Sequence, residues 1–294
     1  MKRLIGAPGG GARQVLLVLP MTALIVAVLF VPAGMGLWKS FQSSSIYQLE
    51  TTFSLANYTE LLGDPVFWSA VQTSVFIGLM TALVTVVLGY WLAHFMRFTR
   101  PASAPVIFSA LLVALIGGYL VRIYAWRTLL GDSGVINTAL MGLGIVKEPL
   151  GGLLFSPFAI FVALGSIYLP YAALLISAGL GGVGADEIEA ARDLGASRFR
   201  TYRGIVVPMA GRSMFQAFIL IFLLSASDYV IPQLVGGPRT QMVGSVIYTA
   251  LVSGGNAGQG AAIAFLSMLL FGAIIGLVWF AARGIGLIPK AVAG

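Results

Sequence analysis

Charged residues are scarce in this sequence. Of its 294 residues, 9% are charged and 59% are hydrophobic. Soluble globular domains carry about 25% charged residues, so this chain has too little charge to cover the surface of a water-soluble fold of its length. We therefore expect its outer surface to face lipid.

Cysteine is absent, and histidine occurs only once, as His94. The first absence excludes disulfides and thiolate metal sites, and the second excludes a site built from several imidazoles, so we expect no metal. Neither H-E-x-x-H nor G-x-S-x-G occurs, and the apolar runs hold no paired carboxylates. An intramembrane enzyme is therefore disfavoured, and we predict no catalytic residue.

Long apolar runs are what the sequence does contain. Each is close to or longer than the ~20 residues that a membrane-spanning helix needs. The first run follows a short tail, residues 1–14. At about 23 residues, this run is longer than the apolar region of a signal peptide, which has roughly 7–15 residues. We predict an all-α integral membrane protein with six transmembrane helices in one domain, residues 15–294. The runs are roughly Val15–Leu37, Phe67–Ala93, Val106–Leu130, Phe158–Leu180, Ser213–Val235 and Ala261–Ala282.

The basic residues indicate the orientation of these spans. The formal net charge is +7, but the basic segments match no nucleic-acid-binding motif and lie in short loops between spans. Both termini and the loop 181–212 fall on one side with twelve Lys and Arg, against five on the other side. The positive-inside rule therefore places both termini and this loop in the cytoplasm.

The loop 181–212 is the one polar stretch with clear helical character. Asp186 is a good N-cap, with Glu189 three residues later. Gly195 can end that helix in a left-handed conformation. A second short helix is expected over Ser197–Tyr202, before Pro208. We predict a compact helix lying across the cytoplasmic face.

This loop resembles the EAA loop of ABC importer permeases. That motif reads E-A-A, three residues, G, nine residues, I-x-L-P. Here Glu189-Ala190-Ala191 precede Gly195, and Ile205-Val206-Val207-Pro208 follow at the same spacing, with Val207 in place of the usual Leu. The resemblance implies the type I ABC importer permease fold, with six transmembrane helices, a cytoplasmic coupling helix and both termini in the cytoplasm.

In that family the loop docks on the ATPase subunit. The resemblance implies that role here for Glu189, Ala190, Ala191, Asp193 and Gly195. For Glu189, capping its own helix and docking are both open, and both can hold. The arginines that follow, Arg198, Arg200 and Arg203, are interpreted as determinants of topology.

No phosphate-binding G-x-x-x-x-G-K-[ST] motif occurs, and the glycines around 179–184 lack its Lys and Ser/Thr. We therefore expect this chain to bind no cofactor, and the resemblance implies an ABC ATPase dimer that uses ATP and Mg.

Asp228 is the clearest ionisable residue within an apolar run. A charge at the centre of a span costs roughly 2.5–3.5 kcal/mol on insertion scales. Pro232 is expected to interrupt the helix one turn later and to free the Asp228 carbonyl. A broken helix with a carboxylate and Tyr229 suits a cation path. The alternatives are that Asp228 pairs with Arg122 or another basic residue, or lies in the external interface.

Four further residues are candidates for the pathway: Arg122, Trp126, Tyr168 and Tyr171. Tyr119, Arg122 and Trp126 share one helical face. Arg122 either snorkels to the surface, which we favour, or lines the pore. Tyr168 and Tyr171 flank Pro170 and either line the pore or pack between helices.

Two stretches, Val121–Asn137 and Asp228–Tyr248, are similar to permeases of the spermidine/putrescine importer group. That resemblance implies a polyamine or similar organic cation as cargo. Related permeases handle iron, sulfate, thiamine, opines and aminophosphonates, and an amino-acid-like solute is a further alternative.

The resemblance also implies partners and a location. We expect a second permease, most simply a different chain, a periplasmic binding protein, contact with membrane lipid, and transport by alternating access in the bacterial inner membrane. No nucleic acid is expected. A self-contained channel or secondary transporter is the competing class, but it leaves the helix within 181–212 without a function.

Overall fold

The computed structural model describes residues 10–45, 48–182, 189–191, 193–238 and 240–284. Five of its helices are long and apolar enough to cross a membrane, and a bent pair makes a sixth candidate. This confirms the predicted helical membrane fold. The long helices are α1 (Gly10–Ser40), α3 (Pro65–His94), α7 (Pro157–Gly181), α10 (Val207–Ala226) and α12 (Ala257–Gly284).

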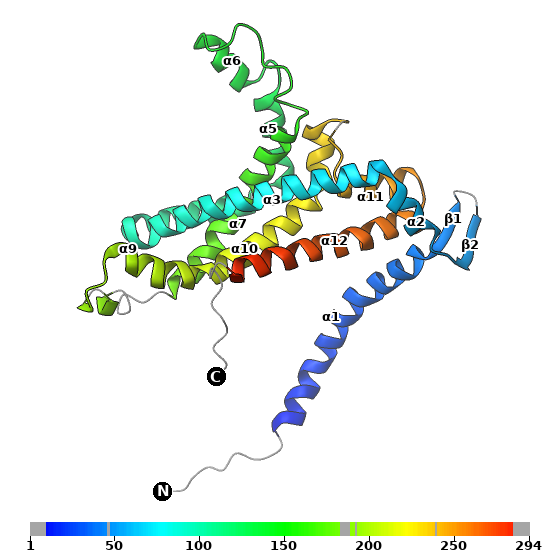
Figure 1. The fold of residues 1–294 in the computed structure, drawn as a ribbon, viewed down its shortest axis with the longest axis horizontal. Coiled ribbons are helices and arrows are strands. Elements are labelled where there is room, and N and C mark those ends of the chain that lie inside the picture. Colours follow the sequence, from blue (N-terminus) through cyan, green and yellow to red (C-terminus); the bar gives the residue numbers. More distant parts are fainter. Residues whose placement is uncertain (1–9, 46–47, 183–188, 192, 239, 285–294) are drawn as a thin grey trace.

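Shorter elements join these helices. A two-stranded antiparallel hairpin, which the sequence analysis did not predict, occupies the loop after α1. The hairpin, α2 and α11 lie toward one end of the bundle and α9 at the other, and we call these the hairpin end and the α9 end, while α5 and α6 project from the side of the bundle (Figure 1). The short elements are β1 (Gln42–Ser45), β2 (Gln48–Phe53), α2 (Ala56–Gly63), η1 (Phe95–Thr99), η2 (Pro101–Ser103), α4 (Ala104–Ile116), α5 (Tyr119–Leu130), α6 (Val135–Gly142), α9 (Arg198–Thr201), η3 (Tyr202–Val206), η4 (Pro232–Gly236), α11 (Val243–Tyr248) and η5 (Thr249–Ser253).

The core of the bundle is formed where α3, α7 and α10 pack together. Small residues let these backbones approach closely. A Cβ added at Gly89 of α3 would lie 2.8 Å from the Cβ of Ala172 on α7, and one at Gly78 would lie 2.9 Å from the Cβ of Ala226 on α10. The close approach of α3 to α7 and α10 therefore depends on the absence of a side chain at these two glycines.

Helix α1 diverges from this bundle. It meets the other helices only near its C-terminal end, as Figure 1 shows, where Gly36 lies close to Phe265 of α12. The described side chains of α1 are exposed from Val18 to Met35. The helix begins at Gly10, five residues before the predicted start of the first span, and residues 1–9 of the predicted tail lie outside the described part.

The third span, predicted as one helix over Val106–Leu130, is broken. The segments Pro101–Ile116 and Tyr119–Gly142 meet at an angle of 92°. Gly117 and Gly118 separate them, both in an extended conformation. The Arg122 side chain donates a 3.1 Å hydrogen bond to the Gly117 carbonyl oxygen at the end of α4. A cation at a helix C-terminus stabilises such free carbonyls, which makes the bend possible at membrane depth.

The fifth span also differs from its predicted bounds, Ser213–Val235. The spanning helix covers Gly204–Ala226 instead. The predicted short helix at Ser197–Tyr202 is present as α9, but it continues through the π turn η3 into α10. Pro208 follows directly after the π turn η3, in the first turn of α10, and the helical path continues through it.

Candidate functional site

The segment Glu189–Gly195 forms the end of a helix at the α9 end. The Leu194 amide donates to the Ala190 carbonyl at 3.1 Å, and the Ala196 amide donates to the Ala191 carbonyl at 3.0 Å. Gly195 has φ +79°, which confirms the predicted left-handed helix end. The predicted N-cap, Asp186, lies outside the described residues.

This helix end presents its side chains to the surrounding medium. Glu189, Ala190 and Asp193 are exposed, and Ala191 is half-buried. Leu194 is 89% exposed, which is unusual for a large apolar side chain next to a helical turn. The described helix end is therefore an open surface with an apolar residue at its tip.

Asp228 lies where the chain leaves α10, just beyond the spanning helix. The helix ends at Ala226, not at Pro232 as the sequence analysis predicted. Pro232 instead lies in the first turn of η4, where proline is tolerated. Asp228 Oδ1 accepts a 3.0 Å hydrogen bond from the Ile231 amide, so the carboxylate caps the short helical segment that follows the break.

The second carboxylate oxygen has a partner from another span. The Tyr119 hydroxyl, on α5, donates a 2.6 Å hydrogen bond to Asp228 Oδ2. Tyr168 of α7 is near enough to interact electrostatically with Asp228. The site therefore joins the broken third span, α7 and the break after α10.

Further aromatic rings come from the elements that meet at Asp228. Tyr229 stacks on Tyr248 of α11, with ring centroids 5.3 Å apart and planes at 12°. Tyr168 meets Tyr171 edge to face at 6.0 Å. Tyr168, Tyr171 and Tyr229 were predicted from the sequence as candidates for the pathway, but Tyr248 was not. Tyr119 was placed on the right helical face without its role as the partner of Asp228.

Arg122 and Trp126 extend from the same face of α5 as Tyr119, as predicted. The indole N–H of Trp126 donates to Ser166 Oγ of α7 at 2.7 Å. Arg122 donates to the carbonyl oxygens of Gly117 and Ile167, at 3.1 and 3.4 Å. These bonds hold α5 against α7, and Arg122 is half-buried rather than extended to the surface.

In the described part of the chain, no ion pair joins Asp228 to Arg122 or to any other basic residue. Its hydrogen-bond donors are instead a phenol and backbone amides. A half-buried carboxylate without a cationic partner is costly, and the surrounding tyrosines attract cations through their ring faces. Chemically, this arrangement suits the binding of an ammonium group.

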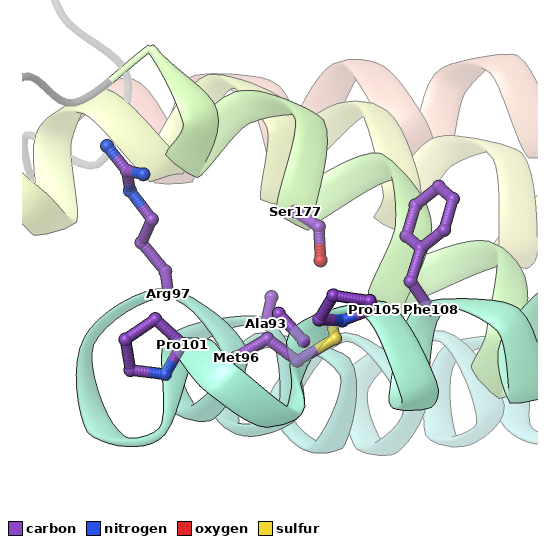
Figure 2. A pocket seen from close by; sticks show the side chains of 8 residues that line it. Ala93, Met96, Arg97, Pro101, Pro105, Phe108 and Ser177 are labelled. Carbon is purple, nitrogen blue, oxygen red and sulfur yellow. The ribbon is translucent and has the colours of Figure 1, made fainter.

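Two cavities lie near the ends of the bundle. One, of about 370 Å³, adjoins η4 and α11 at the hairpin end, and its polar side chains are Gln233, Gln241, Thr240, Ser245 and Thr249. The other, of about 400 Å³, lies between η1, α4 and α7. Figure 2 shows the Ser177 hydroxyl pointing into this second cavity opposite Met96, with Arg97 at one side. Its walls are otherwise apolar, and it lies far along α7 from Tyr168.

Comparison with known proteins gives relatives with transport functions. PotB, the spermidine/putrescine transport system permease protein of Escherichia coli (strain K12), is 28% identical over 260 residues, which cover 88% of this chain and 94% of PotB. SugA, the trehalose transport system permease protein of Mycobacterium tuberculosis (strain CDC 1551 / Oshkosh), is 28% identical over 279 residues, which cover 88% and 84% of the two chains.

The fold is also found in a solved structure. A bacterial alginate ABC transporter in complex with an alginate pentasaccharide-bound periplasmic protein matches with a TM-score of 0.72 at 14% identity, covering 94% of this chain and 96% of that one. At this identity the likeness concerns the fold alone.

Residues 103–283 match the family described as binding-protein-dependent transport system inner membrane component. The match includes Glu189–Gly195 and Asp228, and it covers more than half of the chain. The chain therefore belongs to this family and is a multi-pass inner-membrane permease subunit of an ABC importer, a translocation subunit and not by itself an enzyme.

Proposed function

We propose that this chain forms, with a second permease subunit, the pathway for a polyamine or a similar small organic cation. Separate ATPase subunits drive this transport by hydrolysing ATP with Mg, and a periplasmic binding protein delivers the cargo. The pathway opens alternately to the two sides of the membrane. The single observation that carries the cargo proposal is the Asp228 carboxylate, which lies among tyrosines without a basic partner in the described chain.

The ATPase contact is assigned to the helix end around Glu189–Gly195. Glu189, Ala190 and Asp193 are exposed, and Leu194 at the tip is almost fully so. An apolar tip flanked by the acidic Glu189 and Asp193 suits a groove with an apolar floor and basic rim. Because basic residues concentrate around this loop, the α9 end and both termini are assigned to the cytoplasm.

The binding protein is assigned to the hairpin end, opposite the ATPase. The segment α5–α6 rises away from the bundle beside the loop that carries η4 and α11 (Figure 1). The alginate transporter of similar fold was solved with a periplasmic protein bound. Delivery at this end would place cargo next to Asp228.

The cargo assignment combines the site with relatedness. A protonated amine could donate to Asp228 Oδ2 beside the Tyr119 hydroxyl, which continues to orient that oxygen, while Ile231 keeps Oδ1 in place. Tyrosine faces would then contact the charge or the methylene chain, at about 0.5–2 kcal/mol for each cation–π contact. PotB, a spermidine/putrescine permease, is related over most of its length.

A sugar is the second candidate. The trehalose permease SugA is as similar in identity as PotB, and stacked tyrosines with a cavity lined by amides and hydroxyls also suit a neutral polyol. A neutral sugar, however, leaves the charge of Asp228 without a role. Iron, thiamine, opines, aminophosphonates and amino-acid-like solutes remain alternative cargoes of the same mechanism.

Uptake by the reconstituted importer tests both parts of this proposal. The complete complex is placed in proteoliposomes, and uptake of labelled spermidine, putrescine and trehalose is measured with and without ATP. ATP-dependent uptake of a polyamine is expected. Uptake of trehalose alone would overturn the cation assignment, and polyamine uptake that needs neither ATP nor the ATPase would identify a self-contained transporter.

A further inference from the structure

The loop at the α9 end is tied to α3 by a pair of tyrosines. The hydroxyl of Tyr202, the first residue of the π turn η3, is hydrogen-bonded to the hydroxyl of Tyr90 on α3. The imidazole of His94, one turn further along α3, meets the Tyr202 ring edge to face at 5.5 Å. Tyr90 is 8% exposed. The contact is therefore a part-buried hydrogen bond that is flanked by the His94 ring.

Tyr202 occupies a special position in the chain. It lies seven residues after Gly195, where the exposed helix ends, and η3 leads directly into α10. π turns are rare and occur frequently at functional sites. Any movement of the loop would therefore be transmitted through this turn to the spanning helix α10.

The middle of α3 and the end of α10 meet beside Asp228. Ser74 Oγ of α3 accepts a 2.8 Å hydrogen bond from the Val243 amide at the start of α11. Gly78 of α3 packs on Ala226, the last residue of α10. A Cβ added at Gly244 would lie 2.8 Å from the Asp228 carbonyl oxygen, so α11 closes on the break itself.

Helices α3 and α10 therefore form a frame that is joined at two points. Tyr90 and Tyr202 join it at the α9 end, and Gly78 and Ala226 join it next to the cargo site. From Tyr90 to Gly78 is about 18 Å along a helix. Two helices that are joined at two points move together, whereas two helices that are joined at one point can move relative to each other.

We infer that the Tyr90–Tyr202 bond is a positioning link that makes α3 follow the ATPase-facing loop, so that ATP-driven movement of the loop reaches the Asp228 break. This inference rests on the proposed ATP-driven function, but not on the proposed cargo. Neither tyrosine contacts the cargo in this assignment, so both act through the helices that carry them. Ordinary packing between α3 and α10 is the competing explanation.

The absence of cysteine from this chain allows a test that is independent of cargo. A cysteine is placed at Val66, an exposed residue in the first turn of α3 at the hairpin end. In the assembled importer, its rate of labelling by a maleimide is measured with and without ATP, in the wild-type background and with Tyr90→Phe, Tyr202→Phe and both together. Phenylalanine removes only the hydroxyl and keeps the rings packed.

We expect ATP to change the labelling rate in the otherwise wild-type chain. In each single variant, the ATP-dependent change in labelling rate should be about fivefold smaller. Losing one neutral hydrogen bond costs about 1 kcal/mol, which shifts a two-state equilibrium by about that factor. The double variant should resemble either single variant because all three lose the same bond. ATP hydrolysis should persist in each variant, since the helix end Glu189–Gly195 that is assigned to the ATPase contact is unaltered.

Tyr58→Phe is the matched control. Tyr58 also shares a hydroxyl–hydroxyl hydrogen bond, with Ser40 at 2.7 Å, but at the hairpin end. It should leave the ATP-dependent change intact. The inference is overturned if ATP leaves labelling at Val66→Cys unaltered in the wild-type background, if both single variants keep the full change, or if Tyr58→Phe shrinks it equally. A failure of polyamine uptake would instead concern only the proposed cargo.

Discussion

The hydroxyl of Tyr119 donates a 2.6 Å hydrogen bond to Oδ2 of Asp228, across 109 residues of sequence. This bond joins the bend of the third span to the segment that follows the spanning helix α10. Both places leave backbone groups without a helical partner, and a side chain bonds to them at each: Arg122 at the end of α4, and Asp228 at the start of the segment leading to η4. The site is thus built from the same residues that make its irregular backbone possible.

Replacing Asp228 with Asn should lower polyamine uptake strongly while the complex still assembles. Asparagine caps helices about as well as aspartate, so the bond from the Ile231 amide can persist, but the negative charge is lost. Uptake by the reconstituted complex is the measurement. Asp64→Asn is the control because Asp64 also caps a helix, through the Val66 amide, at an exposed position. Unchanged uptake by Asp228→Asn would assign that residue to structure alone.

Replacing Tyr119 with Phe should raise the KM of polyamine uptake without preventing assembly. The hydroxyl orients Oδ2, and losing one such bond costs about 1 kcal/mol, or about fivefold in affinity. The concentration dependence of uptake is the measurement. Tyr124→Phe on the same helix, where the side chain is exposed, should have no effect. An unaltered KM in Tyr119→Phe would show that the carboxylate needs no orienting partner.

Apolar composition was sufficient to predict the membrane fold, and local helix-ending signals were sufficient to predict the helix end at Gly195. Five of the six predicted spans correspond to single long helices, although the fifth begins and ends nearer the N-terminus than predicted. The EAA spacing identified a segment that ends in the predicted left-handed glycine. These features depend on local sequence, since hydropathy and helix-ending signals act over a few residues.

The breaks and the site could not be predicted in the same way. The apolar run continues across Gly117 and Gly118, so hydropathy gives no sign of the 92° bend. Pro232 led to the wrong prediction of where the fifth helix is interrupted, because proline is also tolerated in the first turn of a helix. Tyr248 reaches Tyr229 through the tertiary packing of α11, and no local pattern indicates such a contact.

Replacing Gly89 with Ala should destabilise the bundle. The added Cβ would lie 2.8 Å from the Cβ of Ala172, closer than such atoms approach, so α3 and α7 must separate. Overpacking of this kind costs typically about 1–3 kcal/mol, and thermal unfolding in detergent would show it as a lower Tm. Gly276→Ala on α12 is the matched control because nothing lies within 4 Å of its added Cβ. Equal Tm values for the two variants would contradict the close packing of α3 on α7.

Replacing Gly195 with Val should weaken capture of the ATPase subunit while the bundle remains folded. At φ +79° a side chain is strained, by roughly 1–2 kcal/mol for an ordinary residue, and the strain would unwind the helix end that presents Glu189 and Leu194. Gly195→Asn should be milder because asparagine tolerates this conformation. Gly204→Ala in η3, where an added Cβ meets nothing within 4 Å, is the control. Co-purification of the ATPase with each variant measures the effect. We expect capture of the ATPase to decrease in the order Gly204→Ala, Gly195→Asn, Gly195→Val. Equal capture by all three variants would mean that ATPase binding does not depend on the conformation of this helix end.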